Sequence, residues 1–213
     1  MSLLRSNDFE KSLDEICQLP ARQAVNPLFS FFYNTNDLIK WRAITAMGAV
    51  VSGLADQDME SARVVMRRLI WNLNDESGGI GWGSPEAMGE IMARHSRIAE
   101  EYDFLLVSYV NEQGNYLEHP MLQRGVLWGL GRLAHSRPRL VNHAAPFLLP
   151  YMRSEDAYHR GLSAWTAGAL ESGLTKSLLQ HLSNDNAVIK IFIDKHLIER
   201  TVGQLAREAL SKL

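Results

Sequence analysis

A repeat with a period near forty residues constrains this chain more than any other feature. Four helix-like segments are each closed by a glycine, and these glycines are Gly48, Gly89, Gly131 and Gly168. Their spacings are 41, 42 and 37 residues. A period near forty with two helices per unit is typical of stacked helical hairpins, because a single hairpin cannot bury its apolar face alone.

The remaining sequence also favours helices. Apolar residues recur three and four positions apart, in stretches separated by short polar breaks. Pro20 ends the first stretch, and Ser84 followed by Pro85 is a strong start signal for a later one. We expect helices at residues 8–19, 21–33, 38–55, 58–71, 84–101, 103–112, 119–135, 138–153, 155–171 and 174–182.

The pattern changes at the C-terminal end. Residues 187–193 are rich in β-branched side chains and alternate in polarity, and residues 197–201 can return as a second strand. Thr201 can cap a terminal helix over residues 202–213. Because an isolated hairpin is marginally stable, we expect it to pack against the last helical unit and cap the open end of the stack. One long helix from 186 to 213 is the alternative.

Three of the repeated segments carry a resemblance to a known family. Trp41 to Gly48, Arg124 to Gly131 and Arg160 to Gly168 resemble the second helix of HEAT repeats, which begins with a basic residue and ends in small residues and glycine. The blocks at 71–83 and 127–134 are also similar to uncharacterised HEAT-like proteins of anaerobic sulfate- or metal-reducing bacteria.

The resemblance implies a mostly α fold. We expect an α-α superhelix, a HEAT-like solenoid of about four to five helical hairpins over residues 21–183. A small C-terminal β-hairpin and terminal helix over residues 186–213 would follow, and all 213 residues would form one domain.

Composition excludes several classes of protein. The chain is 46% hydrophobic and 22% charged, which excludes a disordered chain, and its net charge of −2 makes a nucleic-acid partner unlikely on electrostatic grounds. Its one cysteine, Cys17, excludes a disulfide framework. No apolar run reaches eighteen residues, and Asp8 and Glu10 stand where an export signal would be apolar. We therefore expect a cytoplasmic protein without a membrane partner.

The most unusual stretch is the glycine-rich segment at 71–86, which leads into the second repeated segment. It contains four of the fifteen glycines and two of the five tryptophans, and it lacks the fingerprints of nucleotide-binding loops. A partner or ligand site and a purely structural turn explain it equally well. Its candidate binding residues are Trp71, Asn72, Asn74, Asp75, Glu76 and Trp82.

Charged and aromatic residues on the predicted helices supply further candidates. Glu86 and Glu90 lie one turn apart and could act together, although we expect a solvated acidic face. Residues 119–170 hold six arginines, which could form a basic stripe interleaved with tryptophans. The competing hypothesis, which we favour, is that these tryptophans fill one core position in two repeats. The candidates are Arg124, Trp128, Arg132, Arg160 and Trp165.

No catalytic or metal-binding signature accompanies these residues. The seven histidines form no His-Glu-x-x-His or Glu-x-x-His motif, so we expect no metal and no cofactor. The sequence favours a non-catalytic protein-interaction module that binds a protein partner. Two alternatives stay open from the resemblance: a HEAT-like DNA glycosylase that acts on alkylated bases through Trp128, Trp165 and Asp75 or Glu76, and a cofactor lyase or chaperone.

Overall fold

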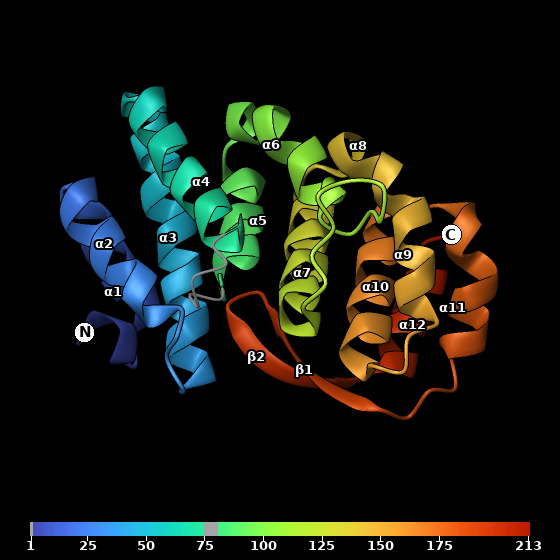
Figure 1. The fold of residues 1–213 in the computed structure, drawn as a ribbon. Coiled ribbons are helices and arrows are strands. Elements are labelled where there is room, and N and C mark those ends of the chain that lie inside the picture. Colours follow the sequence, from blue (N-terminus) through green and yellow to red (C-terminus); the bar gives the residue numbers. More distant parts are fainter. Residues whose placement is uncertain (1, 75–80) are drawn as a thin grey trace.

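A row of five helices forms the inner layer of the fold (Figure 1). The computed structural model describes residues 2–74 and 81–213. Each helix of the inner row packs on the next one, and the row begins near the N-terminus and ends near the C-terminus. Its members are α3 (Asp37–Gln57), α5 (Ser84–Arg94), α7 (Pro120–Ser136), α10 (Ala157–Leu170) and α12 (Val202–Leu210).

The other helices cover the inner row and complete the helical pairs. They are α1 (Phe9–Gln18), α2 (Ala21–Phe31), α4 (Met59–Asn74), α6 (Ser96–Ser108), α8 (Pro138–Val141), α9 (Ala145–Met152) and α11 (Lys176–Leu182). Short 3-10 turns lie at Leu3–Arg5, Asn142–Ala144 and Gly173–Thr175. The result is a helical-repeat solenoid, and the expected fold class is confirmed.

Glycines on the inner row, the repeat glycines among them, allow its helices to approach closely. A methyl group on Gly89 of α5 would overlap the backbone of Gly129 in α7, so any larger residue would push the two helices apart. The apolar core runs without a break along the stack, from Leu4 to Ala209. The glycines that reveal the repeat therefore have a packing role.

Two neighbouring predicted helices, at 84–101 and 103–112, have wrong bounds, because one helix, α6, covers Ser96–Ser108. The expected helix over residues 84–101 ends at Arg94, and α6 begins at Ser96. The break is at His95, whose backbone is extended (φ −126°, ψ 115°) and whose Nδ1 accepts a hydrogen bond from the Ile98 amide at 3.3 Å. Histidine is not among the usual N-capping residues, so no strong local signal marks this break. The predicted helix over 138–153 is also divided, into α8 and α9.

Helix α3 is long and apolar enough to cross a membrane by length and composition alone. Its best window has a mean hydropathy of 1.2, and 56% of that window is buried inside the protein. Ala43, Ile44 and Met47 are fully buried in the core between neighbouring helices. The hydropathy of α3 is thus that of a core helix.

The C-terminal hairpin forms, and the alternative of one long helix is wrong. Strands β1 (Val188–Ile193) and β2 (His196–Thr201) pair antiparallel, with Ile191 opposite Ile198. Both residues of the turn, Asp194 and Lys195, have positive φ angles of 50° and 64°. This is the pattern of a tight two-residue hairpin turn.

The hairpin packs on α10 of the last helical unit, as expected, but it does not cap the open end of the stack. The hairpin extends beneath the inner row toward the N-terminal helices (Figure 1), and Lys195 Nζ at its tip lies 2.6 Å from the carboxylate of Glu10 in α1. Helix α12, rather than the hairpin, packs on α10 and α11 at the end of the stack. The physical reason is a row of aromatic side chains on the inner helices, because the hairpin shields their apolar surface from water.

Candidate functional site

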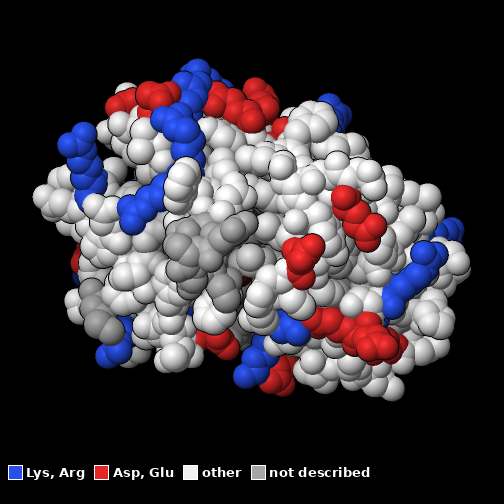
Figure 2. Space-filling model, in the orientation of Figure 1, with Lys and Arg blue, Asp and Glu red and all other residues white. Residues whose placement is uncertain are grey.

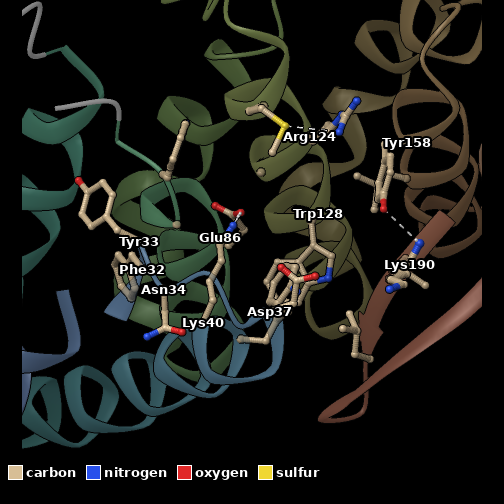
Figure 3. Close-up of a pocket in the computed structure, with 18 of the residues that line it drawn as sticks. Phe32, Tyr33, Asn34, Asp37, Lys40, Glu86, Arg124, Trp128, Tyr158 and Lys190 are labelled. Atoms are coloured by element: carbon tan, nitrogen blue, oxygen red, sulfur yellow. Dashed lines mark hydrogen bonds and ion pairs between the residues drawn. The ribbon is translucent and has the colours of Figure 1, made fainter. Parts of the chain in front are cut away.

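Two of the pockets that the hairpin borders lie along α3, α5, α7 and α10. The first, which we name the Glu86 pocket, has a volume of about 320 Å³ and lies at the N-terminal turns of α3, α5, α7 and α10 (Figure 3). The second, which we name the Arg132 pocket, lies further along the same helices and has a volume of about 340 Å³. Lys190 and Ile191 of β1 border the first pocket, and Phe192 and Ile193 border the second.

Between the two pockets, Phe192 of the hairpin covers an aromatic row on the inner helices made of Trp41 and Trp128. The rings of Trp41 and Phe192 are stacked with centroids 5.0 Å apart, and the ring of Trp128 lies 4.6 Å from that of Trp41. Trp128 is only 3% exposed, and its indole N–H donates to the Phe192 carbonyl oxygen at 2.8 Å. Trp128 is therefore a core residue to which the hairpin is attached.

The Glu86 pocket keeps aromatic side chains that nothing in the described chain covers. Tyr33, which follows α2, and Trp82, which precedes α5, have ring centroids 6.4 Å apart. They are 48% and 40% exposed, which is unusual for side chains of this size. On the opposite wall, the guanidinium of Arg124 lies 4.6 Å from the centre of the Tyr158 ring.

A buried carboxylate lies at the base of this pocket. Glu86 is 6% exposed, and its Oε1 is 3.5 Å from Lys40 Nζ. Its Oε2 has no hydrogen-bond partner among the residues that the structure describes. This oxygen packs against Gly125 of α7, where a Cβ atom would come within 2.6 Å of it. The solvated acidic face that we expected is thus wrong for Glu86.

The same expectation is wrong for Glu90, for a different reason. Glu90 is 4% exposed and borders the Arg132 pocket. Its two oxygens accept hydrogen bonds from the Nε atoms of Arg94 and Arg132, each at 2.6 Å. Burial is therefore compensated at Glu90, whereas one oxygen of Glu86 is left without a partner.

The expected basic stripe is not a free surface, because its three candidate arginines are all paired. Arg132 bonds Glu90, while Arg124 and Arg160 donate from Nε to Asp156 and Asp185, each at 2.7 Å. The last two pairs join one repeat to the next in the same way. On the face shown in Figure 2, basic and acidic side chains are intermingled instead of forming a patch of one sign.

The acceptors of these two pairs have further partners. Asp156 also accepts from the Tyr158 amide at 2.8 Å, and Asp185 accepts from the Ala187 amide at 2.9 Å. Burial raises the pKa of both carboxyls, but the hydrogen bonds from Arg124 and Arg160 and from these amides outweigh it, so each pKa lies below its usual value. We therefore interpret Arg124 and Arg160 as structural links between repeats.

The structure separates the other candidates. Trp82, Glu86, Arg124 and Trp128 border the Glu86 pocket, whereas Glu90, Arg132 and Trp165 border the Arg132 pocket, which Trp128 also reaches. Trp165 is half-buried and stacks on His135 with centroids 4.7 Å apart. Trp71 is 72% exposed at the end of α4, and Trp71, Asn72, Asn74 and Arg160 border neither pocket. Asp75 and Glu76 lie outside the described residues.

Tyr33, Lys40 and Trp41 border the Glu86 pocket but were not among the candidates predicted from the sequence. Tyr33 and Lys40 flank the break between α2 and α3, and Trp41 begins the first repeated segment. In that segment Trp41 stands directly before a basic residue. Two of the later segments also combine an aromatic residue with an arginine. Comparing the aromatic positions of all the segments could have found Trp41.

The chemistry available at the pocket is that of binding. A carboxylate, a lysine and several aromatic rings can hold a planar or charged group by hydrogen bonds and stacking. Over residues 2–74 and 81–213, no group of three or more His, Cys, Asp or Glu side chains is placed to hold a metal ion.

Comparison with known proteins identifies the fold but not a family. No family model matches the chain. An uncharacterized protein of Archaeoglobus fulgidus is 29% identical over 107 residues, which are 50% of this chain. The matched region spans about half the length of that curated relative, 52% of it.

Several solved structures of similar fold are engineered proteins or designed repeat proteins. An engineered protein from a structural genomics consortium has a TM-score of 0.57 and 17% identity, and the match covers 99% of this chain and 93% of that one. A designed armadillo repeat protein in complex with the peptide (KR)4 has a TM-score of 0.56 and 14% identity, with 99% and 96% covered. A computationally designed armadillo repeat protein for modular peptide recognition has a TM-score of 0.53 and 12% identity, with 99% and 97% covered. At these identities the likeness shows a helical-repeat fold.

Proposed function

We propose that this chain is a non-catalytic, HEAT-like interaction module that receives a segment of a protein partner in the Glu86 pocket. The observation that carries the proposal is the exposed pair of Tyr33 and Trp82 beside a pocket with a buried carboxylate. Tyrosine and tryptophan beside a concave site are typical of the anchors that dominate protein interfaces.

The fold supports the same proposal. Two of the similar designed proteins are described as bound to a peptide or made for peptide recognition. In this chain the hairpin already covers the aromatic row on the inner helices. A partner segment would therefore bind beside the hairpin, where the aromatic rings are still exposed.

The glycosylase alternative has less support. It needs tryptophans that can stack on a base, but the indole of Trp128 is buried and donates to Phe192. It also needs free positive charge for phosphates, and Arg124, Arg132 and Arg160 are all paired. No observation selects a chromophore or another cofactor for the lyase alternative.

Site-specific photo-crosslinking tests the proposal. Trp82→p-benzoylphenylalanine places a crosslinker in the pocket of the full chain, and the same change at Phe104 of α6 is a matched control, because Phe104 is also an exposed aromatic residue (72%). We expect one recurrent partner peptide to be crosslinked at position 82 and not at position 104. We also expect Tyr33→Ala to weaken binding of that purified partner by about 10-fold or more, as for an interface anchor.

Two results would contradict the proposal. One is the same set of crosslinked peptides at positions 82 and 104, which would show nonspecific contact. The other is a partner whose affinity is unchanged by Tyr33→Ala, which would place its binding site elsewhere.

A further inference from the structure

We infer that the partner residue seated in the Glu86 pocket is an arginine. The inference rests on the proposed function and adds the chemistry of the occupant. It starts from Glu86 Oε2, a buried carboxylate oxygen without a hydrogen-bond partner in the described chain. Leaving such an oxygen unpaired costs free energy, so a donor from outside gains more here than at a site already satisfied.

The neighbours of Glu86 show that the occupant has to donate. Lys40 reaches only Oε1, at 3.5 Å, which is longer than a strong charge-assisted hydrogen bond. An acidic occupant would bring a second carboxylate beside Glu86 and would be repelled. A donor group instead completes the carboxylate while Lys40 keeps its place on Oε1.

The charges around the pocket tolerate one more cation. Arg124 is neutralised by Asp156, with Nε and Oδ2 2.7 Å apart. Among the residues that the structure describes, the other charged residues that border the pocket are Asp37, Glu86, Lys40 and Lys190, two of each sign. A single positive charge therefore meets no net repulsion from these residues, and the carboxylates of Glu86 and Asp37 attract it.

The aromatic wall favours arginine over lysine. The exposed ring of Tyr33 lies on the side of the pocket opposite Tyr158 and Lys190 (Figure 3), and the exposed ring of Trp82 lies next to it, with centroids 6.4 Å apart. A guanidinium is planar, stacks on aromatic rings, and is more weakly hydrated than an ammonium group, so burying it costs less. Its several N–H groups can also reach a carboxylate while the plane stays parallel to a ring.

A set of model peptides tests this inference on the full chain. The probes are N-acetyl-Ala-Ala-X-Ala-Ala-amide with arginine, citrulline, lysine or glutamate at X, and the readout is the indole N–H signal of Trp82 in a 15N-labelled sample. Citrulline is the matched probe, because it has nearly the shape of arginine without the charge. We expect arginine to bind at least about 10-fold more tightly than citrulline, and glutamate to bind most weakly.

Two variants of the chain locate the effect. Glu86→Gln should reduce the preference for arginine over citrulline to about 2-fold or less, because the charge at the base of the pocket is gone. Glu101→Gln makes the same chemical change on α6, where Glu101 pairs with Arg63 away from the pocket, and should leave the preference intact. An unchanged Trp128 indole signal in both variants shows that they are folded.

The inference and the proposed function can fail separately. Equal affinities for arginine and citrulline, a preference for glutamate, or no shift of Trp82 with any peptide would overturn the arginine assignment. An ordered water molecule on Oε2 would give the first of these results. The crosslinking experiment could still identify a partner segment without arginine, in which case the proposed function stands and this inference falls.

Discussion

Two glutamates on α5 are buried to the same degree, but their carboxylates differ in how completely they are hydrogen-bonded. Glu90 accepts from two arginines at 2.6 Å, while Glu86, one turn earlier, has a lysine at 3.5 Å and one oxygen without a partner in the described chain. A protein gains nothing in stability from an incompletely bonded buried carboxylate. The difference indicates that the Arg132 side of the hairpin contributes to stability, and it supports the proposal that the Glu86 side binds a partner.

The aromatic residues show the same contrast. Trp128 lies beneath the hairpin with its N–H bonded, whereas Tyr33 and its neighbour Trp82 border the Glu86 pocket away from the hairpin and are exposed. Aromatic side chains thus have two roles in the stack. In the part that the hairpin covers, which we name the covered half, they fill the core. In the part around Tyr33 and Trp82, which we name the open half, they are available to a partner.

Removing one tryptophan from each half should give the largest difference in stability. Trp128→Ala deletes a buried ring and leaves the Phe192 carbonyl without its donor, so we expect a loss of about 3–5 kcal/mol in the free energy of unfolding. Trp82→Ala removes a ring that is 40% exposed, and we expect a loss of about 1 kcal/mol or less. Urea denaturation of the two variants measures both values. Similar losses would remove the distinction between the halves.

The difference in stability between variants of the two glutamates should be somewhat smaller. Glu90→Gln turns one acceptor into an NH2 group that faces an arginine, so we expect it to cost about 2–3 kcal/mol. Glu86→Gln removes a charge whose burial is poorly compensated, so stability should change by no more than about 0.5 kcal/mol or should increase. The same denaturation curves report the effect. A clear loss of stability in Glu86→Gln would mean that its carboxylate is a structural group.

The links between repeats should contribute a smaller amount. Arg160→Lys keeps the charge but loses the Nε donor to Asp185, and Asp185→Asn removes the acceptor charge. We expect a coupling energy of about 1 kcal/mol in the double-mutant cycle. Neither change should alter binding at the Glu86 pocket, which neither residue borders. A binding defect in Arg160→Lys would revive the basic surface that the sequence suggested.

Acid should weaken the helical stack through His159, a residue of α10 that lies outside both pockets. Burial lowers the pKa of His159 below its usual value of 6.5, against the opposing effect of Asp156. The unfolded chain therefore binds a proton more readily, so this contribution to stability is present above pH 6.5 and is lost as pH falls through the folded-state pKa. Urea denaturation between pH 7.5 and 5 measures the slope. His159→Gln, which does not titrate, should have a smaller slope; an equal slope would assign the effect to other groups.

Removing the ion pair at the tip of the hairpin should change the stability least. Lys195 and Glu10 form an ion pair at 2.6 Å, but their side chains are 37% and 66% exposed. Exposed pairs are screened by water, so Lys195→Ala should cost about 0.5 kcal/mol or less. A much larger loss would mean that the tip, rather than Phe192 and Trp128, fixes the hairpin.

Much of the fold could be predicted because it depends on local patterns. Apolar spacing of three and four residues marks the helices, and the β-branched stretch at 187–193 marks the hairpin. The break at His95 was missed because the capping residue has no strong local preference for that position. The position of the hairpin was missed because it depends on Trp41 and Trp128, which are far away in the sequence.

The site was harder to predict than the fold. Trp82 and Glu86 were found as candidates, since an aromatic residue in a glycine-rich stretch and an acid at a helix start are visible locally. The arginines were misinterpreted because a run of positive charge says nothing of its partners. Asp156 and Asp185 pair with them only after the repeats stack.

Hydrogen exchange of the five tryptophan indole N–H groups tests the central claim most directly, because Trp128 and Trp82 report on the two halves in one spectrum. We expect the Trp128 signal to exchange the more slowly of the two, since its N–H donates to Phe192 at 2.8 Å beneath the hairpin. The Trp82 signal should exchange rapidly and should shift when the arginine peptide is added. Rapid exchange of the Trp128 N–H would show that the hairpin dissociates from the aromatic row. A shift of the Trp128 signal rather than the Trp82 signal on binding would show that the row itself is the binding site.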